Sequence, residues 1–270
     1  MNASRIAFVG GGNMAGAIIG GLIGAGRAPS SMLVVEPRAE ARAALERAHG
    51  VATLATADET LADASVVVWA VKPQSFTDAA APCKAYVRGA LQLSVMAGIR
   101  SDVIASATGA AAVVRAMPNT PALIGQGISA LYARPAVGAA QRAEAQALLE
   151  PTGRTLWVDD EAALDAVTAL SGSGPAYVFY LVEAMEAAAA EMGLTPAQGR
   201  ELALATVAGA AELALRSGEP PQVLRERVTS KGGTTHAAIT SLDGDGVKAA
   251  IVRAIVAAQR RARELGDSLR

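Results

Sequence analysis

Cysteine, histidine and aromatic residues are all scarce in this chain. Cys83 is the single cysteine among 270 residues, so no disulfide can form within the chain, and this favours a reducing compartment. The chain has two histidines, His49 and His236, and neither is near Cys83 in the sequence, although a thiol nucleophile needs such a partner beside it. We therefore expect Cys83 to be a structural or surface thiol.

An excess of charge of either sign is also lacking. The chain carries 24 lysines and arginines against 25 aspartates and glutamates, for a formal net charge of -1. A broad basic field for nucleic acid or an anionic membrane is therefore excluded. Apolar stretches such as 203–215 are too short and too interrupted to span a bilayer, and 1–12 shows no basic segment before a long apolar run. We expect a cytoplasmic protein with no nucleic-acid, membrane or metal partner.

The first half of the chain alternates short β-branched segments with alanine-rich helical segments. Helix patterns cover 15–24 and 39–48, and the strand-like segments are 5–9, 32–35, 65–70, 91–95, 113–116, 128–132 and 155–158. Strands that are apolar on both faces and separated by helix-length segments indicate a parallel sheet covered by helices. Residues 1–160 are therefore predicted to form a doubly wound α/β domain.

From about residue 160 the strand signal disappears. Ser173 to Pro175 predicts a helix start with a hydroxyl cap, and Gly193 is placed to end that helix. Thr195 to Gln198 is a capping-box pattern that opens a second helix, which runs to about Ser217. Further helices are expected at 221–228 and 247–265. Residues 161–270 are therefore predicted to form an all-helical domain.

A glycine turn joins the first strand to the first helix. Gly10 to Ala15 has the form G-x-G-x-x-A, in which the glycines allow a tight turn and close approach to a pyrophosphate. The alanine lets the helix pack closely on the strand, and the helix N-terminus offers free amides to the phosphates. Together with Glu36 at the end of the second strand, this turn predicts a Rossmann domain that binds a dinucleotide.

The residues after the second predicted strand are compatible with either NADH or NADPH. Glu36 can accept hydrogen bonds from a ribose 2′-hydroxyl, which favours NADH, and it would repel a 2′-phosphate. Arg38 can receive the phosphate instead, or it can be a solvated side chain at a helix start. The residues themselves leave both cofactors open.

Two loops lie at the carboxyl ends of predicted strands, where ligands bind in open parallel sheets. Lys72, in the loop 70–74, is placed to reach cofactor or substrate, or it is a surface lysine. In 117–121 two prolines restrict Asn119 and Thr120.

Two glycine-containing segments stand in the helical half. The glycines of 171–177 allow either ligand approach or close helix packing. In 229–236 adjacent glycines lead into hydroxyl residues, which can form a backbone nest for a carboxylate or a flexible turn.

These segments follow one another in a definite order: Val9 to Ala15, Ala70 to Gln74, Met96 to Ile99, Met117 to Pro121, Ser171 to Tyr177, and Ser230 to Thr235. Along essentially the whole chain, this set resembles pyrroline-5-carboxylate reductase. The last two segments are the most specific, whereas the glycine turn and the lysine loop occur in several dehydrogenase families.

The resemblance implies reduction of 1-pyrroline-5-carboxylate to L-proline, the last step of proline biosynthesis, by hydride from NADPH, with NADH possible because of Glu36. It places Thr235 against the imine nitrogen, and we take Lys72 as a second catalytic candidate. Ser230, with the amides of Gly233 and Thr234, would bind the substrate carboxylate. The implied cofactor-binding residues are Val9, Gly10, Gly11, Gly12, Asn13, Met14, Glu36, Arg38, Ala70, Val71, Lys72, Pro73 and Ala97.

The resemblance also implies a homodimer built by the helical domain, or a larger homo-oligomer such as a decamer. Two residues depart from the family pattern. Lys231 stands where many members have proline, and Glu36 stands where several have a small or amide residue.

Other functions remain open from the sequence. A 3-hydroxyacid dehydrogenase would resemble its relatives in having a lysine in 171–185, and this chain has none there. A reductase of another cyclic imine would need nearly the same site. A non-catalytic dinucleotide-binding module would leave the glycine-threonine loop unexplained.

Overall fold

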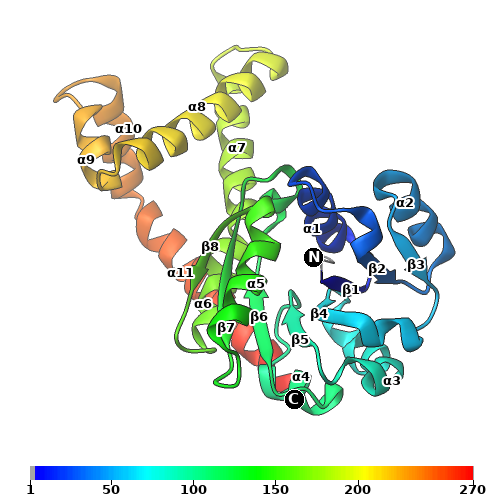
Figure 1. The fold of residues 1–270 in the computed structure, drawn as a ribbon. Coiled ribbons are helices and arrows are strands. Elements are labelled where there is room, and N and C mark those ends of the chain that lie inside the picture. The colour runs from blue at the N-terminus through cyan, green and yellow to red at the C-terminus, as the bar shows by residue number, and fades with distance from the viewer. Residues whose placement is uncertain (1–3, 270) are drawn as a thin grey trace. The chain divides into compact units, whose positions relative to one another are not determined.

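The computed structural model describes residues 4–269, which divide into two compact units (Figure 1). The first unit extends to Ser173 and resumes at Ala258, and the second runs from Gly174 to Ala257. Helix α11 (Val247–Ser268) therefore contributes its first turns to the second unit and its last turns to the first. Each unit is described by itself below.

The first unit is built on an eight-stranded sheet in the order β3-β2-β1-β4-β5-β6-β7-β8. Strands β1 to β6 are parallel, and the chain order reverses beside β1, where ligands bind in doubly wound folds. The strands are β1 (Arg5–Val9), β2 (Met32–Val35), β3 (Ala52–Leu54), β4 (Ala64–Trp69), β5 (Leu91–Ser94), β6 (Val113–Met117), β7 (Gly127–Ala133) and β8 (Gly153–Trp157).

The far edge of the sheet corrects the prediction that all its strands are parallel. Strand β7 pairs antiparallel with β6, and β8 pairs parallel with β7. Residues 118–126 are all that joins β6 to β7, and a parallel return needs a crossover of about a dozen residues or more. The edge strand β3 was also not predicted, because its three residues give no strand pattern.

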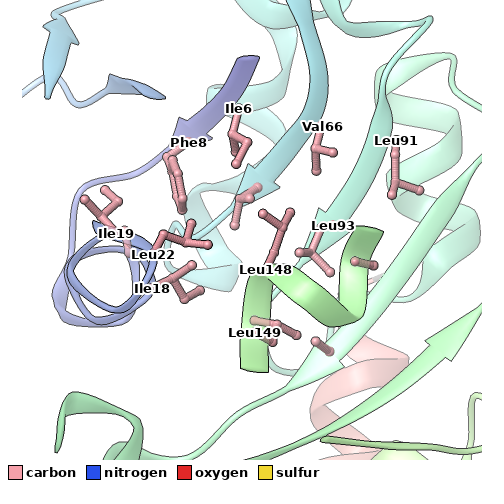
Figure 2. Close-up of a cluster of buried hydrophobic side chains, with 14 of the residues drawn as sticks. Ile6, Phe8, Ile18, Ile19, Leu22, Val66, Leu91, Leu93, Leu148 and Leu149 are labelled. Atoms are coloured by element: carbon pink, nitrogen blue, oxygen red, sulfur yellow. The ribbon is translucent and has the colours of Figure 1, made fainter. Parts of the chain in front are cut away.

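Helices cover both faces of this sheet. They are α1 (Asn13–Gly24), α2 (Ala39–His49), α3 (Phe76–Val87), α4 (Ser101–Thr108), α5 (Ala139–Leu149) and α6 (Ala163–Val167). On one face, Phe8 of β1 and Leu93 of β5 pack with Ile18 of α1 and Leu148 of α5 (Figure 2).

The other face of the sheet has its own buried cluster. Trp69 of β4 meets Phe76 of α3 edge to face, with ring centroids 5.2 Å apart. Cys83 lies in the same cluster, and burial raises the pKa of its thiol to about 11. Because both faces are covered, the predicted doubly wound fold is confirmed.

The second unit is helical, as predicted. It contains α7 (Gly174–Glu191), α8 (Pro196–Ser217), α9 (Pro221–Arg227), α10 (Thr234–Gly244) and the first turns of α11. The predicted capping box is present, with the Thr195 N–H donating to Gln198 Oε1 at 3.0 Å. Helices α7 and α8 pack so closely that a Cβ added to Gly199 would lie 2.8 Å from the Cβ of Ala189.

The predicted cap at Ser173 is not formed. Residues 168–172 make a π-helical turn after α6, and Ser173 itself has helical dihedral angles. A capping residue instead has extended angles. Helix α7 therefore continues from a helical segment that the sequence pattern did not indicate.

Large apolar side chains lie exposed on the helices of the second unit. On α7, Phe179 is 60% and Tyr180 is 75% exposed, whereas its buried residues are Val182 and Ala189. Leu202 and Leu213 of α8 are also exposed. Exposed apolar side chains that gather into a patch often mark an interaction site. In the described part of the chain, no helix is long and apolar enough to cross a membrane.

Candidate functional site

The glycine turn connects β1 to α1 at the point where the strand order reverses. Gly10 has a φ of +96°, and a Cβ there would lie 2.7 Å from the carbonyl oxygen of Ala70. A Cβ on Gly11 would lie 2.6 Å from Leu45 Cδ1, whereas no described atom lies within 4 Å of the corresponding position on Gly12. The third glycine thus faces open space, and no side chain caps α1. The turn therefore suits the approach of a phosphate to backbone amides.

A cavity of about 580 Å³ opens beside this turn, a size typical of small-molecule sites. It brings together most of the predicted cofactor-binding residues, namely Val9, Gly10, Gly11, Gly12, Glu36, Arg38, Ala70, Val71 and Lys72. Asn13 lines a second cavity of about 730 Å³ that also borders Arg38. Within the described chain, Met14, Pro73 and Ala97 line neither cavity.

Glu36 has a buried carboxylate at the end of β2. Its Oε2 accepts the N–H of Gly11 at 3.0 Å, and its Oε1 accepts the N–H and Nε of Arg38 at 3.0 and 2.9 Å. Burial alone would raise the pKa of Glu36, but the hydrogen bonds from Arg38 and Gly11 outweigh it and hold the pKa below its ordinary value. The carboxylate therefore ties the glycine turn to Arg38.

Arg38 carries its guanidinium at the rim of both cavities. Its side chain is 70% exposed, and its bond to Glu36 raises the pKa of the guanidinium. The backbone around it is fixed by Arg42, whose Nη1 donates to the carbonyls of Glu36 and Pro37 at 2.8 Å. A cation is thus presented next to the glycine turn on a rigid segment.

Lys72 and Ala97 follow β4 and β5. Lys72 is exposed beside the 580 Å³ cavity and precedes a short turn that begins at Pro73. Ala97 is half-buried, and Gly98 after it has a φ of +81°.

A cluster of buried charges connects β6, α4 and the segment before α7. Arg100 donates through both Nη atoms to Asp165, at 3.1 and 2.8 Å. Glu161 accepts Arg115 Nη1 at 2.8 Å and the N–H and hydroxyl of Ser101 at 2.7 and 2.6 Å. Burial lowers the pKa of Arg115. Burial raises the pKa of Glu161, but its hydrogen bonds to Ser101 and Arg115 outweigh this and leave the pKa below its ordinary value.

Sequence reasoning missed two parts of this region. The charge cluster had one signal, because Arg115 interrupts the apolar strand β6. The cavity wall also includes Thr56, Ser75 and Asp78. Thr56 follows β3, and because that strand was not predicted, Thr56 could not be placed at the edge of the sheet.

The predicted substrate loop lies in the second unit, between α9 and α10. Gly232 has a φ of +77°, and the Gly233 N–H donates to the Ser230 carbonyl at 3.0 Å. A Cβ on Gly233 would lie 2.7 Å from Ser230 Oγ. No side chain caps α10, and Thr235 in its first turn is half-buried. The loop thus offers hydroxyls and uncapped amides, with the Gly233 N–H already used inside the turn.

Two protein families match separate parts of the chain. The family described as pyrroline-5-carboxylate reductase dimerisation matches residues 161–265. The family described as NADP oxidoreductase coenzyme F420-dependent matches residues 5–98.

Individual relatives match over the full length. A pyrroline-5-carboxylate reductase of Pseudomonas aeruginosa is 44% identical over 274 aligned residues, covering 100% of this chain and 99% of the relative. The solved structure of a pyrroline-5-carboxylate reductase from Coxiella burnetii has a TM-score of 0.92 and 36% identity, covering 98% of this chain and 99% of that one. A Plasmodium falciparum pyrroline carboxylate reductase, solved with NADP bound, has a TM-score of 0.86 and 25% identity, with coverage of 98% and 99%.

Proposed function

The chain belongs to the pyrroline-5-carboxylate reductase family, and we propose that it reduces the ring C=N bond of 1-pyrroline-5-carboxylate to give L-proline, the last step of proline biosynthesis. The observation that carries this function is 44% identity to a reductase over the whole of both chains. NAD(P)H, when bound, supplies the hydride. The open face of Gly12 and the uncapped start of α1 fit the phosphates of such a dinucleotide.

The first unit binds and orients the nucleotide in this proposal. The backbone of 9–14 holds the pyrophosphate, and Glu36 and Arg38 lie at the adenosine ribose. Val71 and Lys72 border the cavity on the side of the nicotinamide ring. Ala97, which follows the next strand, is assigned to the same side. The glycine turn supports this assignment, because Gly10 and Gly11 pack too tightly for a Cβ and Gly12 leaves its backbone open to a ligand.

The second unit binds the substrate. The Ser230 hydroxyl and the uncapped amides at the start of α10 hold the carboxylate, with Gly233 and Thr234 shaping the turn. Thr235 places a hydroxyl at the ring nitrogen. A protonated imine already accepts hydride well, so alignment and one hydrogen bond suffice, and no strong acid is needed.

We further propose NADPH as the preferred cofactor. Arg38 is exposed at the cavity rim and can pair with a 2′-phosphate, as guanidinium groups do. The Glu36 carboxylate, which would repel that phosphate, is buried and already accepts three hydrogen bonds from the chain. NADH is the second candidate, since one acceptor position on Glu36 could still serve a ribose hydroxyl.

The protein forms a homo-oligomer in this proposal. Support comes from the dimerisation family at 161–265 and from the exposed apolar faces of α7 and α8. A homodimer is the first step, and a decamer is the larger assembly that we propose. We also propose that the nucleotide-binding domain is 1–160 and that the substrate and dimerisation domain is 161–270. A cytoplasmic location is proposed as well, because a single free, buried cysteine is compatible with a reducing compartment.

The test is loss of reduced-nicotinamide absorbance with purified protein and 1-pyrroline-5-carboxylate, run in parallel with NADPH and NADH. We expect oxidation with proline as the product, faster with NADPH. Nucleotide binding without oxidation would contradict the proposal. It would favour another cyclic imine as substrate, and then a non-catalytic module if other imines also failed.

A further inference from the structure

Two motifs of the sequence, 117–121 and 171–177, have no role in the site so far, and residues from both of them meet within the first unit. Asn119, in the loop after β6, donates through Nδ2 to the carbonyl of Ser171 at 3.2 Å. A Cβ on Gly172 would lie 2.6 Å from the Cε of Met117, so the same two segments are also in van der Waals contact. Residues 117–119 of the first motif and 171–172 of the second therefore form one structural feature of the first unit.

The segment that Asn119 contacts is the π-helical turn 168–172. Its widened hydrogen bond runs from the Ser173 N–H to the Thr168 carbonyl at 2.8 Å. The turn is also tied by side chains, because Thr168 Oγ1 donates to the Leu164 carbonyl and Ser171 Oγ to the Val167 carbonyl, at 2.7 and 3.1 Å. Single π-helical turns are uncommon and are frequent at functional sites.

Asn119 is itself fixed to the sheet. Its Oδ1 accepts the N–H of Ile128 in β7 at 3.0 Å, so both ends of the amide are used. Pro118 and Pro121 restrict the backbone on either side. The side chain thus links a rigid part of the sheet to the turn, and only Ser173 separates this turn from the start of the second unit at Gly174.

We propose that Asn119 is a positioning residue for hydride transfer. Through Ser171 it holds the π-helical turn, and the turn sets where the chain leaves the nucleotide-binding unit at Ser173. This proposal rests on the proposed function, because Thr235 lies in the unit that follows. Displacing reacting groups by about 1 Å can cost on the order of 100-fold in rate, so a residue remote from the reacting atoms can control turnover.

Asn119→Asp removes the donor and keeps the acceptor. The variant keeps the acceptor for Ile128 but places a carboxylate oxygen against the Ser171 carbonyl. We expect kcat to fall by roughly 10- to 100-fold, with the Kd for NADPH and the Tm close to parental values. We also expect faster hydrogen–deuterium exchange in 165–175 and unchanged exchange in 10–24. Protonating the new carboxyl restores a donor, so the deficit in kcat should shrink as the pH falls.

Gln126→Glu is the matched control, because it adds the same charge at an exposed position of the same loop. It should leave kcat and exchange unchanged. Parental kcat and parental exchange in Asn119→Asp would overturn the proposal. Loss of Tm or NADPH binding in proportion to activity would also overturn it, because the residue would then act only on folding. A parent without reductase activity would contradict the proposed function instead, and exchange in 165–175 would still decide whether Asn119 holds the turn.

Discussion

Glu36 keeps a negative charge where only 5% of the residue is exposed. Burial of an unpaired carboxylate is costly, and charge-assisted hydrogen bonds from Arg38 and Gly11 offset that cost. The same bonds restrain the glycine turn and hold Arg38 at the cavity rim. One carboxylate therefore ties the glycine turn and Arg38 together at the proposed cofactor cavity.

Arg38→Ala should reduce the use of NADPH much more than that of NADH. A charge-assisted hydrogen bond contributes about 1.5–3 kcal/mol, so we expect the Kd for NADPH to rise by roughly 10- to 100-fold. Fluorescence titration with both nucleotides measures this. Arg47→Ala, at an exposed position of α2, the helix that follows Arg38, is the control. Equal weakening of NADH and NADPH binding would show that Arg38 does not contact the 2′-phosphate.

Thr235→Ala should lower turnover while leaving nucleotide binding intact, because the hydroxyl is proposed to act on the substrate nitrogen. We expect kcat/KM for 1-pyrroline-5-carboxylate to fall by roughly 10- to 100-fold, the value of one hydrogen bond at a reacting group. Thr235→Ser keeps the hydroxyl and should recover most of the activity. If the alanine variant had the kinetics of the parent, Thr235 would have no part in the reaction.

At the scale of elements, the buried charges of the first unit connect segments that are far apart in the sequence. Arg115 of β6 and Ser101 of α4 both bind Glu161, which precedes α6. The bidentate bond between Arg100 and Asp165 lies beside them and holds the start of α4 against α6. A buried pair of this kind gives little net stability, but removing one partner leaves an uncompensated charge.

Glu161→Gln should therefore destabilise the protein at neutral pH, by about 3–5 kcal/mol, because Arg115 loses its charged partner. The folded-state pKa of Glu161 lies below its ordinary value of 4.5, so its contribution is complete above that pH and is lost as the pH falls through the folded-state pKa. Denaturant unfolding at pH 7 and pH 4 measures both effects. The loss of stability on acidification should be smaller in the variant than in the exposed control Glu59→Gln. Equal acid dependence would exclude this role.

At the scale of the whole molecule, the two units differ in how much of their apolar surface is buried, and this difference bears on assembly. The first unit buries most of its large apolar side chains in two clusters, whereas α7 and α8 of the second unit leave many exposed. Burial of such surface against another copy would contribute roughly 25 cal/mol per Å². Stability and assembly should then be linked, and the Tm should rise with protein concentration.

Phe179→Asp should weaken assembly, because it places a charge on the exposed apolar face of α7. We expect sedimentation velocity to show smaller species, and the Tm to fall along with the loss of assembly. Ile124→Asp makes the same change at a 76% exposed residue of the first unit and should leave the oligomer unchanged. An unaltered sedimentation profile for Phe179→Asp would place the interface elsewhere.

Local patterns in the sequence determined much of this protein. The G-x-G-x-x-A turn, the β-branched strands and the capping box at Thr195 depend on neighbouring residues, and the structure forms each of them. The tertiary structure alone decided which distant residues meet. The antiparallel β7, the pairing of Arg100 with Asp165 and the contact of Asn119 with Ser171 each depend on partners that no local periodicity specifies. Sequence spacing predicts elements and their faces, whereas such long-range contacts form only when the complete sheet brings its edges and loops together.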